Sequence, residues 1–389
     1  MKHLAIILSM DPDQGGKFQY SMSLLDAFQS FNPKIYTLSI IFFNENWNKY
    51  ILSDHINKFH ARTTIPSRII RKIFLSLPLG LKLWRSIGQY FDPLHISLHS
   101  LKPDLIFYPG NDRYVYEIPL PGVISIHDLM HKYLKGFPEI SNKKIYNSRE
   151  YHYKNVCKYA RGILVDSEMG KSHVLENYNV NENIIHVLPY VAPSYVRTKN
   201  PVPDVNGKYG LPEKYIFYPS MYYKHKNHEG LIKAIHLLKE KGLVINAVFV
   251  GPRKQHFNEV KNVVEQLNLS EQIKCLPHVS NDELVSLYKS AVGLVMPTFA
   301  GPTNIPPLEA FALGCPVVIS NVYGMPAQVE DAALLFDPNN TEELAEKISI
   351  IWNDEFVRRK CIAGGFRRDS EWNQDKFNLR FRTITNAWI

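Results

Sequence analysis

Short runs of apolar and β-branched residues recur along the chain and alternate with segments of helical periodicity. In the first half, such runs predict strands at residues 4–10, 35–43, 104–108, 123–127, 162–166 and 184–188. Regular alternation of strands and helices is typical of a parallel sheet wrapped by helices. The first half of the chain therefore predicts an α/β domain of the Rossmann type.

Residues 191–207, rich in proline and turn formers, predict a linker, after which the pattern restarts. The second set of strands is predicted at residues 215–219, 244–250, 272–276, 292–296, 317–320 and 333–336. Helices are predicted between them, and the aromatic-rich segment 372–388 suits packing across domains. We therefore predict a Rossmann-like domain over residues 1–195, a second over 196–370, and a C-terminal helix over 371–389 that packs back on the first.

Composition narrows the class of protein. A hydrophobic share of 45% and a charged share of 21% are ordinary for a globular chain of 389 residues. The four cysteines form no CxxC pair, which argues against a zinc site or a disulfide framework and fits a reducing compartment. No stretch approaches 18 uncharged apolar residues, so no membrane span is expected.

The net charge of +8 is concentrated in one place. Between Asp54 and Asp92 the chain has no acidic residue, while basic residues alternate with bulky apolar ones over residues 58–90. This mixture is typical of a helix that lies on an anionic membrane surface. A buried helix whose arginines line one solvent-exposed face is an equal alternative. Nucleic-acid binding is not expected, because no recognition motif accompanies the charge.

Several predicted strands end in loops that carry chemistry, which is where doubly wound sheets bind ligands. These loops include Gly15-Gly16, residues 109–112 and His127-Asp128. The first loop lacks the third glycine of the dinucleotide fingerprint, so NAD binding is disfavoured. Asp13 and Asp112 are candidates for steering an acceptor hydroxyl, although both also suit ordinary loop positions.

Four blocks, in this order and spacing, resemble the retaining glycosyltransferases of family 4. They are Gly15-Gly16, residues 127–129, residues 226–228 and residues 301–310. The resemblance implies the GT-B fold, in which two Rossmann-like domains face each other across a cleft. It also implies that a nucleotide diphosphate sugar is bound mainly by the second domain and the acceptor by the first.

Residues 298–312 form the best-defined block. Glycine and small polar residues let a backbone approach a diphosphate closely, and the following helix directs amides towards that anion. The resemblance implies that Glu309 holds the ribose and that Thr303, Asn304 and Ile305 contact phosphate or sugar. The family pattern E-x7-E has its first glutamate where this chain has Gly301.

Lys226 is the candidate cation for the charge that develops on the departing diphosphate. Relatives usually pair it with an arginine about five positions earlier, where this chain has Met221, and Lys224 is a candidate substitute. The resemblance places His127 beside the reactive carbon of the donor sugar. It also lets Gly15 and Gly16 fold over the diphosphate or the acceptor.

The sequence thus predicts a metal-independent, cofactor-free hexosyltransferase that acts with retention of anomeric configuration. The expected donor is a UDP- or GDP-linked sugar. The expected acceptor is a polyprenyl-linked glycan, a surface polysaccharide or a lipopolysaccharide. The expected location is cytoplasmic, peripheral at the inner face of the cell membrane through residues 58–90. Two alternatives remain open: a nucleotide-sugar epimerase of the same fold and a non-catalytic nucleotide-sugar-binding homologue.

Overall fold

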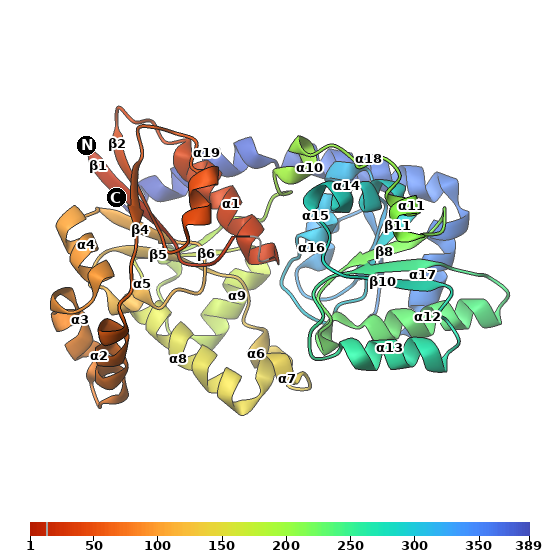
Figure 1. Ribbon diagram of the computed structural model, residues 1–389, viewed down its shortest axis with the longest axis horizontal. Helices are drawn as coiled ribbons and strands as arrows, with labels where there is room; N and C mark the ends of the chain where they lie inside the picture. Colours follow the sequence, from red (N-terminus) through yellow and green to blue (C-terminus); the bar gives the residue numbers. More distant parts are fainter. Residues whose placement is uncertain (13–14) are drawn as a thin grey trace. The chain divides into compact units, whose positions relative to one another are not determined.

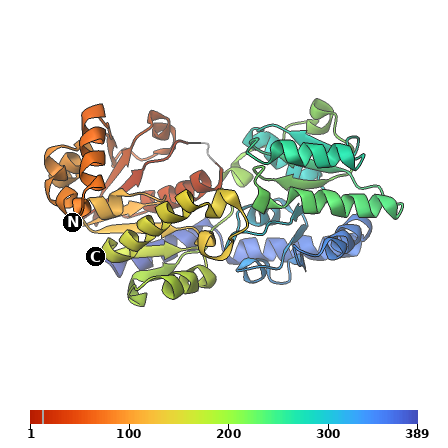
Figure 2. The same ribbon diagram turned by 90° about the horizontal axis from the view of Figure 1, so that it is seen from below.

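The computed structural model describes residues 1–12 and 15–389. The chain divides into two compact units. Unit 1 comprises Met1–Leu129, Tyr146–Pro189 and Gln374–Ile389, and unit 2 comprises Met130–Ile145 and Tyr190–Asn373. In each unit, helices cover a central sheet (Figures 1 and 2). The expected α/β architecture with two Rossmann-like sheets is confirmed.

The sheet of unit 1 has seven parallel strands in the order β3-β2-β1-β4-β5-β6-β7. Their bounds are β1 Lys2–Leu8, β2 Tyr36–Phe42, β3 Asn57–His60, β4 Leu105–Tyr108, β5 Gly122–Ile126, β6 Gly162–Val165 and β7 Ile185–Val187. Six match the predicted runs. The sequence pattern missed β3, an edge strand whose polar residues are mostly exposed and form no apolar run.

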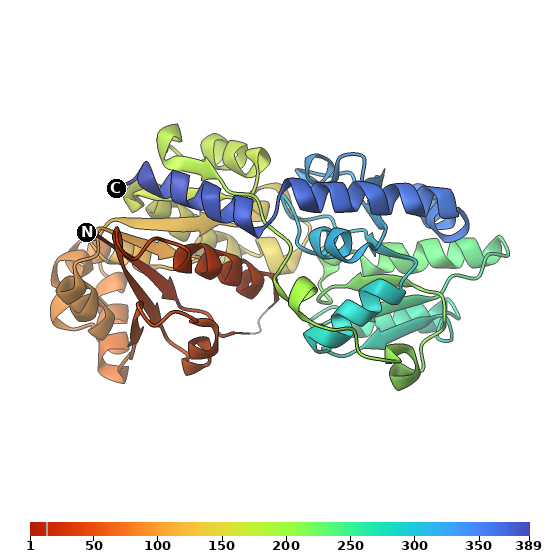
Figure 3. The same cartoon turned by 90° about the horizontal axis from the view of Figure 1, so that it is seen from above.

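Helices connect these strands and cover the sheet. Their bounds are α1 Gly15–Gln29, α2 Ile65–Ser76, α3 Gly80–Ile87, α4 Pro93–Leu101, α5 Tyr114–Glu117, α8 Lys143–Tyr159, α9 Glu168–Asn177 and α19 Gln374–Asn386. The C-terminal α19 lies beside α1 (Figure 3). Its Phe381 ring is 5.8 Å from that of Phe31 and 4.8 Å from that of Phe107, so the last helix completes the core of unit 1.

The sheet of unit 2 has six parallel strands in the order β10-β9-β8-β11-β12-β13. Their bounds are β8 Ile216–Pro219, β9 Ala247–Val250, β10 Ile273–Leu276, β11 Gly293–Met296, β12 Val317–Ser320 and β13 Ala333–Phe336. The helices are α6 Met130–Tyr133, α7 Pro138–Ser141, α10 Tyr195–Thr198, α11 Val205–Tyr209, α12 His228–Glu240, α13 Phe257–Gln266, α14 Asn281–Ser290, α15 Pro306–Leu313, α16 Met325–Val329, α17 Thr341–Asn353 and α18 Glu355–Glu371.

The segment predicted as a linker is packed into unit 2. Tyr195 and Val196 of α10 are buried, and so is Val205 at the start of α11. Proline and turn residues here interrupt regular structure without exposing the chain. In the part of the chain that the structure describes, no helix combines the length and the apolar character needed to cross a bilayer.

Each sheet has one point at which the strand order reverses. In unit 1 the reversal lies between β1 and β4, and in unit 2 it lies between β8 and β11. The connections that leave these strand pairs run in opposite directions, which opens a crevice at their carboxyl ends. The loops after β1, β4, β8 and β11 are therefore the positions at which ligand chemistry is expected.

Candidate functional site

The two predicted donor-binding segments of unit 2 meet at its switch point. A short 3₁₀ helix, η4 (Lys224–Lys226), follows β8, and residues 297–305 follow β11. The carbonyl oxygen of His225 accepts a hydrogen bond from the Phe299 amide at 2.8 Å and from the Thr298 hydroxyl at 3.2 Å. These bonds tie η4 to the start of the glycine-containing loop and bring Lys224 and Lys226 to the same edge as that loop.

The main chain of Lys226 is held on both sides. Its amide donates to the Tyr223 carbonyl at 3.0 Å, and its carbonyl accepts from the Tyr218 hydroxyl at 2.8 Å. The next residue, Asn227, has a left-handed backbone with φ of 57° and caps α12 through the Gly230 amide at 3.1 Å. The backbone that carries the Lys226 cation is therefore well fixed, as electrostatic stabilisation requires.

His225 is also linked to α7, a contact that sequence analysis missed. The His225 amide and ring Nδ1 both donate to Glu139 Oε1, at 2.9 Å and 2.8 Å. Burial opposes ionisation of Glu139, but the hydrogen bonds from His225 outweigh it and lower the pKa of this carboxyl group. Glu139 therefore anchors η4 as a carboxylate.

The loop around Gly301 has a conformation that excludes other residues. Gly301 has φ of +115°, and a Cβ atom there would lie 2.9 Å from Asn304 Nδ2 and 3.1 Å from the Thr303 carbonyl. Gln328 closes the loop by accepting from the Asn304 amide at 3.0 Å and donating to the Asn304 carbonyl at 2.6 Å. The family's first glutamate is thus replaced where the backbone requires glycine. The Asn304 amide, expected to serve a ligand, is engaged by Gln328.

Helix α15 offers fewer amides than the sequence argument assumed. It begins with Pro306 and Pro307, which have no N–H, and Ile305 provides no side-chain cap. The Leu308 amide donates to the Ile305 carbonyl at 2.9 Å. Amide contacts to a diphosphate would therefore have to come from the loop rather than from the first turn of the helix.

Glu309 lies inside unit 2, with only 7% of its surface exposed. Its Oε2 accepts a hydrogen bond from the Tyr288 hydroxyl at 2.6 Å. Burial raises the pKa of Glu309, and the hydrogen bond from Tyr288 opposes that rise. Glu309, the residue predicted to bind the ribose, thus has its carboxyl group positioned by Tyr288.

In unit 1, His127 follows β5 and is half-buried. Its Nε2 lies 3.0 Å from the Pro109 carbonyl oxygen, and its ring meets the Tyr20 ring edge-on at 5.0 Å. Burial lowers the pKa of His127 to about 4, and the charge of Lys17 acts in the same direction. The imidazole is therefore neutral at pH 7, with its proton on Nε2, because a carbonyl can only accept.

A cavity of about 860 Å³ lies at the switch point of unit 1. Ser9, Asn111 and Asp112 line it from the loops after β1 and β4, and Arg68 and Lys72 line it from α2. This places the β1 and β4 loops, which sequence analysis singled out, around one space.

Asp112, a sequence-predicted candidate for steering an acceptor hydroxyl, lies in the lining of this cavity. It is 7% exposed, and Oδ2 has no hydrogen-bond partner among the residues described. Burial raises the pKa of Asp112 to about 6, although a hydrogen bond with Ser9 and the charge of Lys17 partly offset the rise. A hydroxyl-bearing ligand would supply the missing hydrogen bond.

Gly15 begins α1 with φ of +65°, and, its chain neighbours apart, no atom of the described residues lies within 4 Å of the position of its Cβ. Gly16 is exposed in the first turn of α1, whereas Asp13 lies outside the described residues. Within residues 1–12 and 15–389, no group of three or more His, Cys, Asp or Glu side chains could hold a metal ion.

The candidate residues therefore fall into two sets. Lys224, Lys226 and the 303–309 segment lie around the switch point of unit 2. Gly15, Gly16 and His127 lie on connections that follow β1 and β5 in unit 1.

Two parallel sheets, each with loops at a switch point, are the architecture of the GT-B fold. Residues 204–368 match the family model described as "Glycosyl transferases group 1". The chain is thus a glycosyltransferase with the GT-B fold, and the segment that matches the group 1 model lies in its second unit.

Known proteins that resemble the chain agree with this class. It is 27% identical over 275 residues to O-antigen chain mannosyltransferase B of Escherichia coli, covering 67% of this chain and 71% of that one. It is 25% identical over 282 residues to O-antigen chain mannosyltransferase RfbU of Salmonella typhimurium, covering 67% and 75%. The solved structure of Anabaena Alr3699/HepE in complex with UDP and glucose matches with a TM-score of 0.74 at 15% identity, covering 100% of both chains.

Proposed function

We propose that this glycosyltransferase moves a hexose, in the first instance mannose, from a nucleotide diphosphate sugar to an O-antigen or other lipid-linked or surface glycan. The names of the two mannosyltransferases support the sugar and the acceptor class. The complex of the fold relative with UDP and glucose supports a nucleotide-linked donor, and both UDP- and GDP-linked sugars are candidates. The observation that carries the proposal is the junction of η4 with residues 297–305 at the switch point of unit 2.

The proposed mechanism uses positioning and charge. Lys226 stabilises the diphosphate as it departs, together with Lys224 and the amides of Thr303 and neighbouring loop residues. The acceptor hydroxyl attacks the anomeric carbon on the face that the diphosphate leaves, and the leaving phosphate takes up its proton. The configuration is therefore retained without a protein nucleophile. Neutral His127 contacts the sugar through hydrogen bonds rather than as a cation.

The Lys226→Ala variant tests the site. We expect a fall in kcat of roughly 100-fold or more, the size seen when one fixed donor to a developing negative charge is removed. The affinity for the nucleotide, measured by calorimetry with UDP and with GDP, should change less. Lys233→Ala, on the exposed face of α12, is the matched control and should behave like the wild type. Equal kinetics of the two variants would remove Lys226 from the mechanism.

An activity assay with a panel of nucleotide sugars separates the rival functions. A donor panel with a membrane extract as acceptor should yield a glycosylated product, and NMR of the new linkage reports retention or inversion. An epimerised donor in the absence of acceptor would indicate the epimerase. Nucleotide binding without product across the panel would indicate a non-catalytic homologue. We also propose that transfer needs no metal, so that EDTA leaves the rate unchanged; a rate lost with EDTA and restored by Mg²⁺ or Mn²⁺ contradicts this.

We further propose that α2 lies on an anionic membrane surface at the inner face of the cell membrane. One face of α2 is apolar and exposed to solvent. It consists of Ile65, Ile69 and Ile73, together with Leu77 just after the helix, and each of these residues is at least 47% exposed. Ser67 is the only buried residue of α2, which supports a surface position for this helix, whereas the neighbouring α3 buries Gly80 and Trp84. Arg68 and Lys72 flank the apolar face, and Figure 1 shows α2 at the periphery of unit 1.

Vesicle flotation tests this second proposal. The wild type should float with vesicles that contain phosphatidylglycerol at low salt and less so with phosphatidylcholine alone. The Ile69→Ser/Ile73→Ser variant should lose flotation, while Leu52→Ser, which also removes an exposed leucine outside α2, should retain it. Flotation of the Ile69→Ser/Ile73→Ser variant at the wild-type level would refute the assignment.

A further inference from the structure

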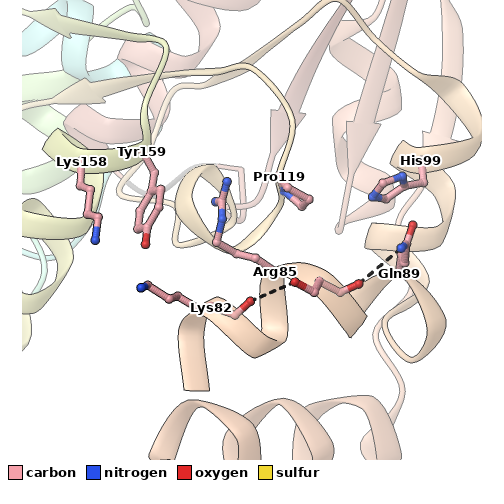
Figure 4. A pocket seen from close by; sticks show the side chains of 8 residues that line it. Lys82, Arg85, Gln89, His99, Pro119, Lys158 and Tyr159 are labelled. Atoms are coloured by element: carbon pink, nitrogen blue, oxygen red, sulfur yellow. Dashed lines mark hydrogen bonds between the residues drawn. The ribbon is translucent and has the colours of Figure 1, made fainter. Parts of the chain in front are cut away.

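A second cavity of unit 1, of about 600 Å³, has a strongly basic lining. Lys82 and Arg85 of α3, His99 of α4, and Lys158 and Tyr159 at the end of α8 contribute to it (Figure 4). None of the described residues that line it is acidic. Cations of two separate elements, α3 and α8, therefore meet in one space without a carboxylate.

This cavity lies at the edge of the sheet opposite to the candidate site. His99 is in the last turn of α4, which precedes β4, and Tyr159 ends α8, which precedes β6. Pro119, also in the lining, precedes β5. The cavity is thus at the amino ends of β4, β5 and β6, whereas His127 and Asp112 follow the carboxyl ends. Its cations play no part in the sugar transfer itself.

Arg85 is held in place while part of its guanidinium group stays available. Nη1 donates to the Tyr116 carbonyl at 2.5 Å, and the guanidinium carbon lies 4.4 Å from the centre of the Tyr159 ring. Among the described residues, no hydrogen bond engages Nη2. Burial lowers the pKa of Arg85, an effect that the nearby tyrosines Tyr159 and Tyr108 only partly offset. The group is a partly desolvated cation that has no anionic partner in the described part of the chain.

The two lysines add charge around the same tyrosine. The Lys158 ammonium lies 5.1 Å from the centre of the Tyr159 ring, so a second cation shares the ring with Arg85. In Figure 4 the Lys82 and Lys158 ammonium groups approach the hydroxyl end of Tyr159. Like charges gathered in this way repel each other, and an anion between them would reverse the sign of that interaction. His99 adds a polar nitrogen, because its buried Nε2 has no hydrogen-bond partner among the described residues.

We infer that this cavity binds a phosphate group, which Arg85, Lys82 and Lys158 hold by charge-assisted hydrogen bonds. The inference goes beyond the proposed sugar transfer, since it assigns an anchoring site away from the reacting atoms. A phosphate can come from a lipid headgroup or from a soluble molecule. The exposed Leu79 and Leu83 beside Lys82 favour the lipid headgroup, because they can enter the acyl region while the cations meet the phosphate.

The Lys82→Ala/Lys158→Ala variant is the test. Both side chains are exposed, so the fold should be retained, and Lys143→Ala/Lys144→Ala removes two exposed charges from α8 as a matched control. Titration with inorganic phosphate, followed by NMR, should show binding that is roughly tenfold weaker in the first variant than in the control. Because Lys226 is intact in both, the difference reports on this cavity alone.

Flotation separates the two sources of phosphate. If the phosphate belongs to a lipid, vesicles of phosphatidylcholine with phosphatidylglycerol should retain the control variant and release the Lys82→Ala/Lys158→Ala variant. Equal flotation combined with weakened phosphate binding assigns the cavity to a soluble ligand. Equal behaviour of both variants in both assays overturns the inference. Turnover with a water-soluble acceptor should be unchanged in both variants, which keeps this outcome separate from failure of the proposed transfer.

Discussion

Replacement of Asp112 by asparagine should stabilise the protein at neutral pH. The carboxyl group is 7% exposed, and burial raises its pKa from 3.8 to about 6. The folded protein therefore binds this proton more tightly than the unfolded chain does. The free energy of unfolding should accordingly fall as the pH rises from about 4 to about 6, and level off above.

The size of the effect follows from the two pKa values. A rise from 3.8 to about 6 corresponds to about 3 kcal/mol against the folded state at pH 7. Asparagine keeps the shape and an acceptor for Ser9 but carries no charge, so Asp112→Asn should gain up to about 3 kcal/mol above pH 7. Below pH 4 the wild type is protonated as well, and the gain should vanish.

Urea denaturation of both proteins at pH values from 4 to 8 measures the difference. If Asp112 orients an acceptor hydroxyl, the stabilised variant should also lose turnover. Asp26→Asn is the matched control, because burial likewise raises the pKa of Asp26 to about 6, yet this residue lies on α1 outside the cavity. It should gain stability and keep full activity. Equal free energies of unfolding for wild type and Asp112→Asn at pH 8 would refute the electrostatic reasoning, and unchanged turnover would refute the role with the acceptor.

Three further changes test the site of unit 2. Gly301→Glu restores the family motif in the sequence but should destabilise the protein by about 1–3 kcal/mol, because φ of +115° is strained for any residue with a side chain. Thermal unfolding measures this loss, and unchanged stability would contradict it. Tyr288→Phe removes the donor to Glu309, and the affinity for UDP or GDP should fall while the fold persists; calorimetry checks this, and unaltered affinity separates Glu309 from the nucleotide. Glu139→Gln should cost about 1–2 kcal/mol at pH 7, and the cost should shrink as the pH falls through the lowered pKa of Glu139, because the His225 contact is strongest when the carboxyl group is ionised; an unchanged cost throughout an acid titration would refute this.

The sheets were largely readable from the sequence. Buried parallel strands are continuous apolar runs, as in β1 and β5, and these produce a signal that survives without tertiary information. The edge strand β3 contains no such apolar run, because its residues are mainly polar and exposed. The packing of α10 into unit 2 was likewise hidden, since prolines around it are equally typical of a linker.

The candidate site was predictable only in its local parts. The glycine-containing loop after β11 pointed to residues 298–309, and the resemblance of residues 226–228 to family 4 pointed to Lys226. The contact between His225 and Glu139 joins residues 86 positions apart through a single pair of side chains, so it left no pattern in the sequence. The basic run at residues 58–90 was visible, but the convergence of Lys82 with Lys158 depends on how α3 and α8 pack.

Gly301 shows why a lost motif residue and a retained site are compatible. The main chain of this loop is held by the His225 carbonyl at one end and by the Gln328 side chain at the other, and none of these bonds involves position 301. A glutamate in this backbone conformation would be strained, so the change of residue and the shape of the loop depend on each other. The charge that the family places at this position is absent here. In the proposed mechanism, Lys226 and the loop amides therefore carry a larger share of the interaction with the donor, which makes Lys226→Ala the decisive test of that mechanism.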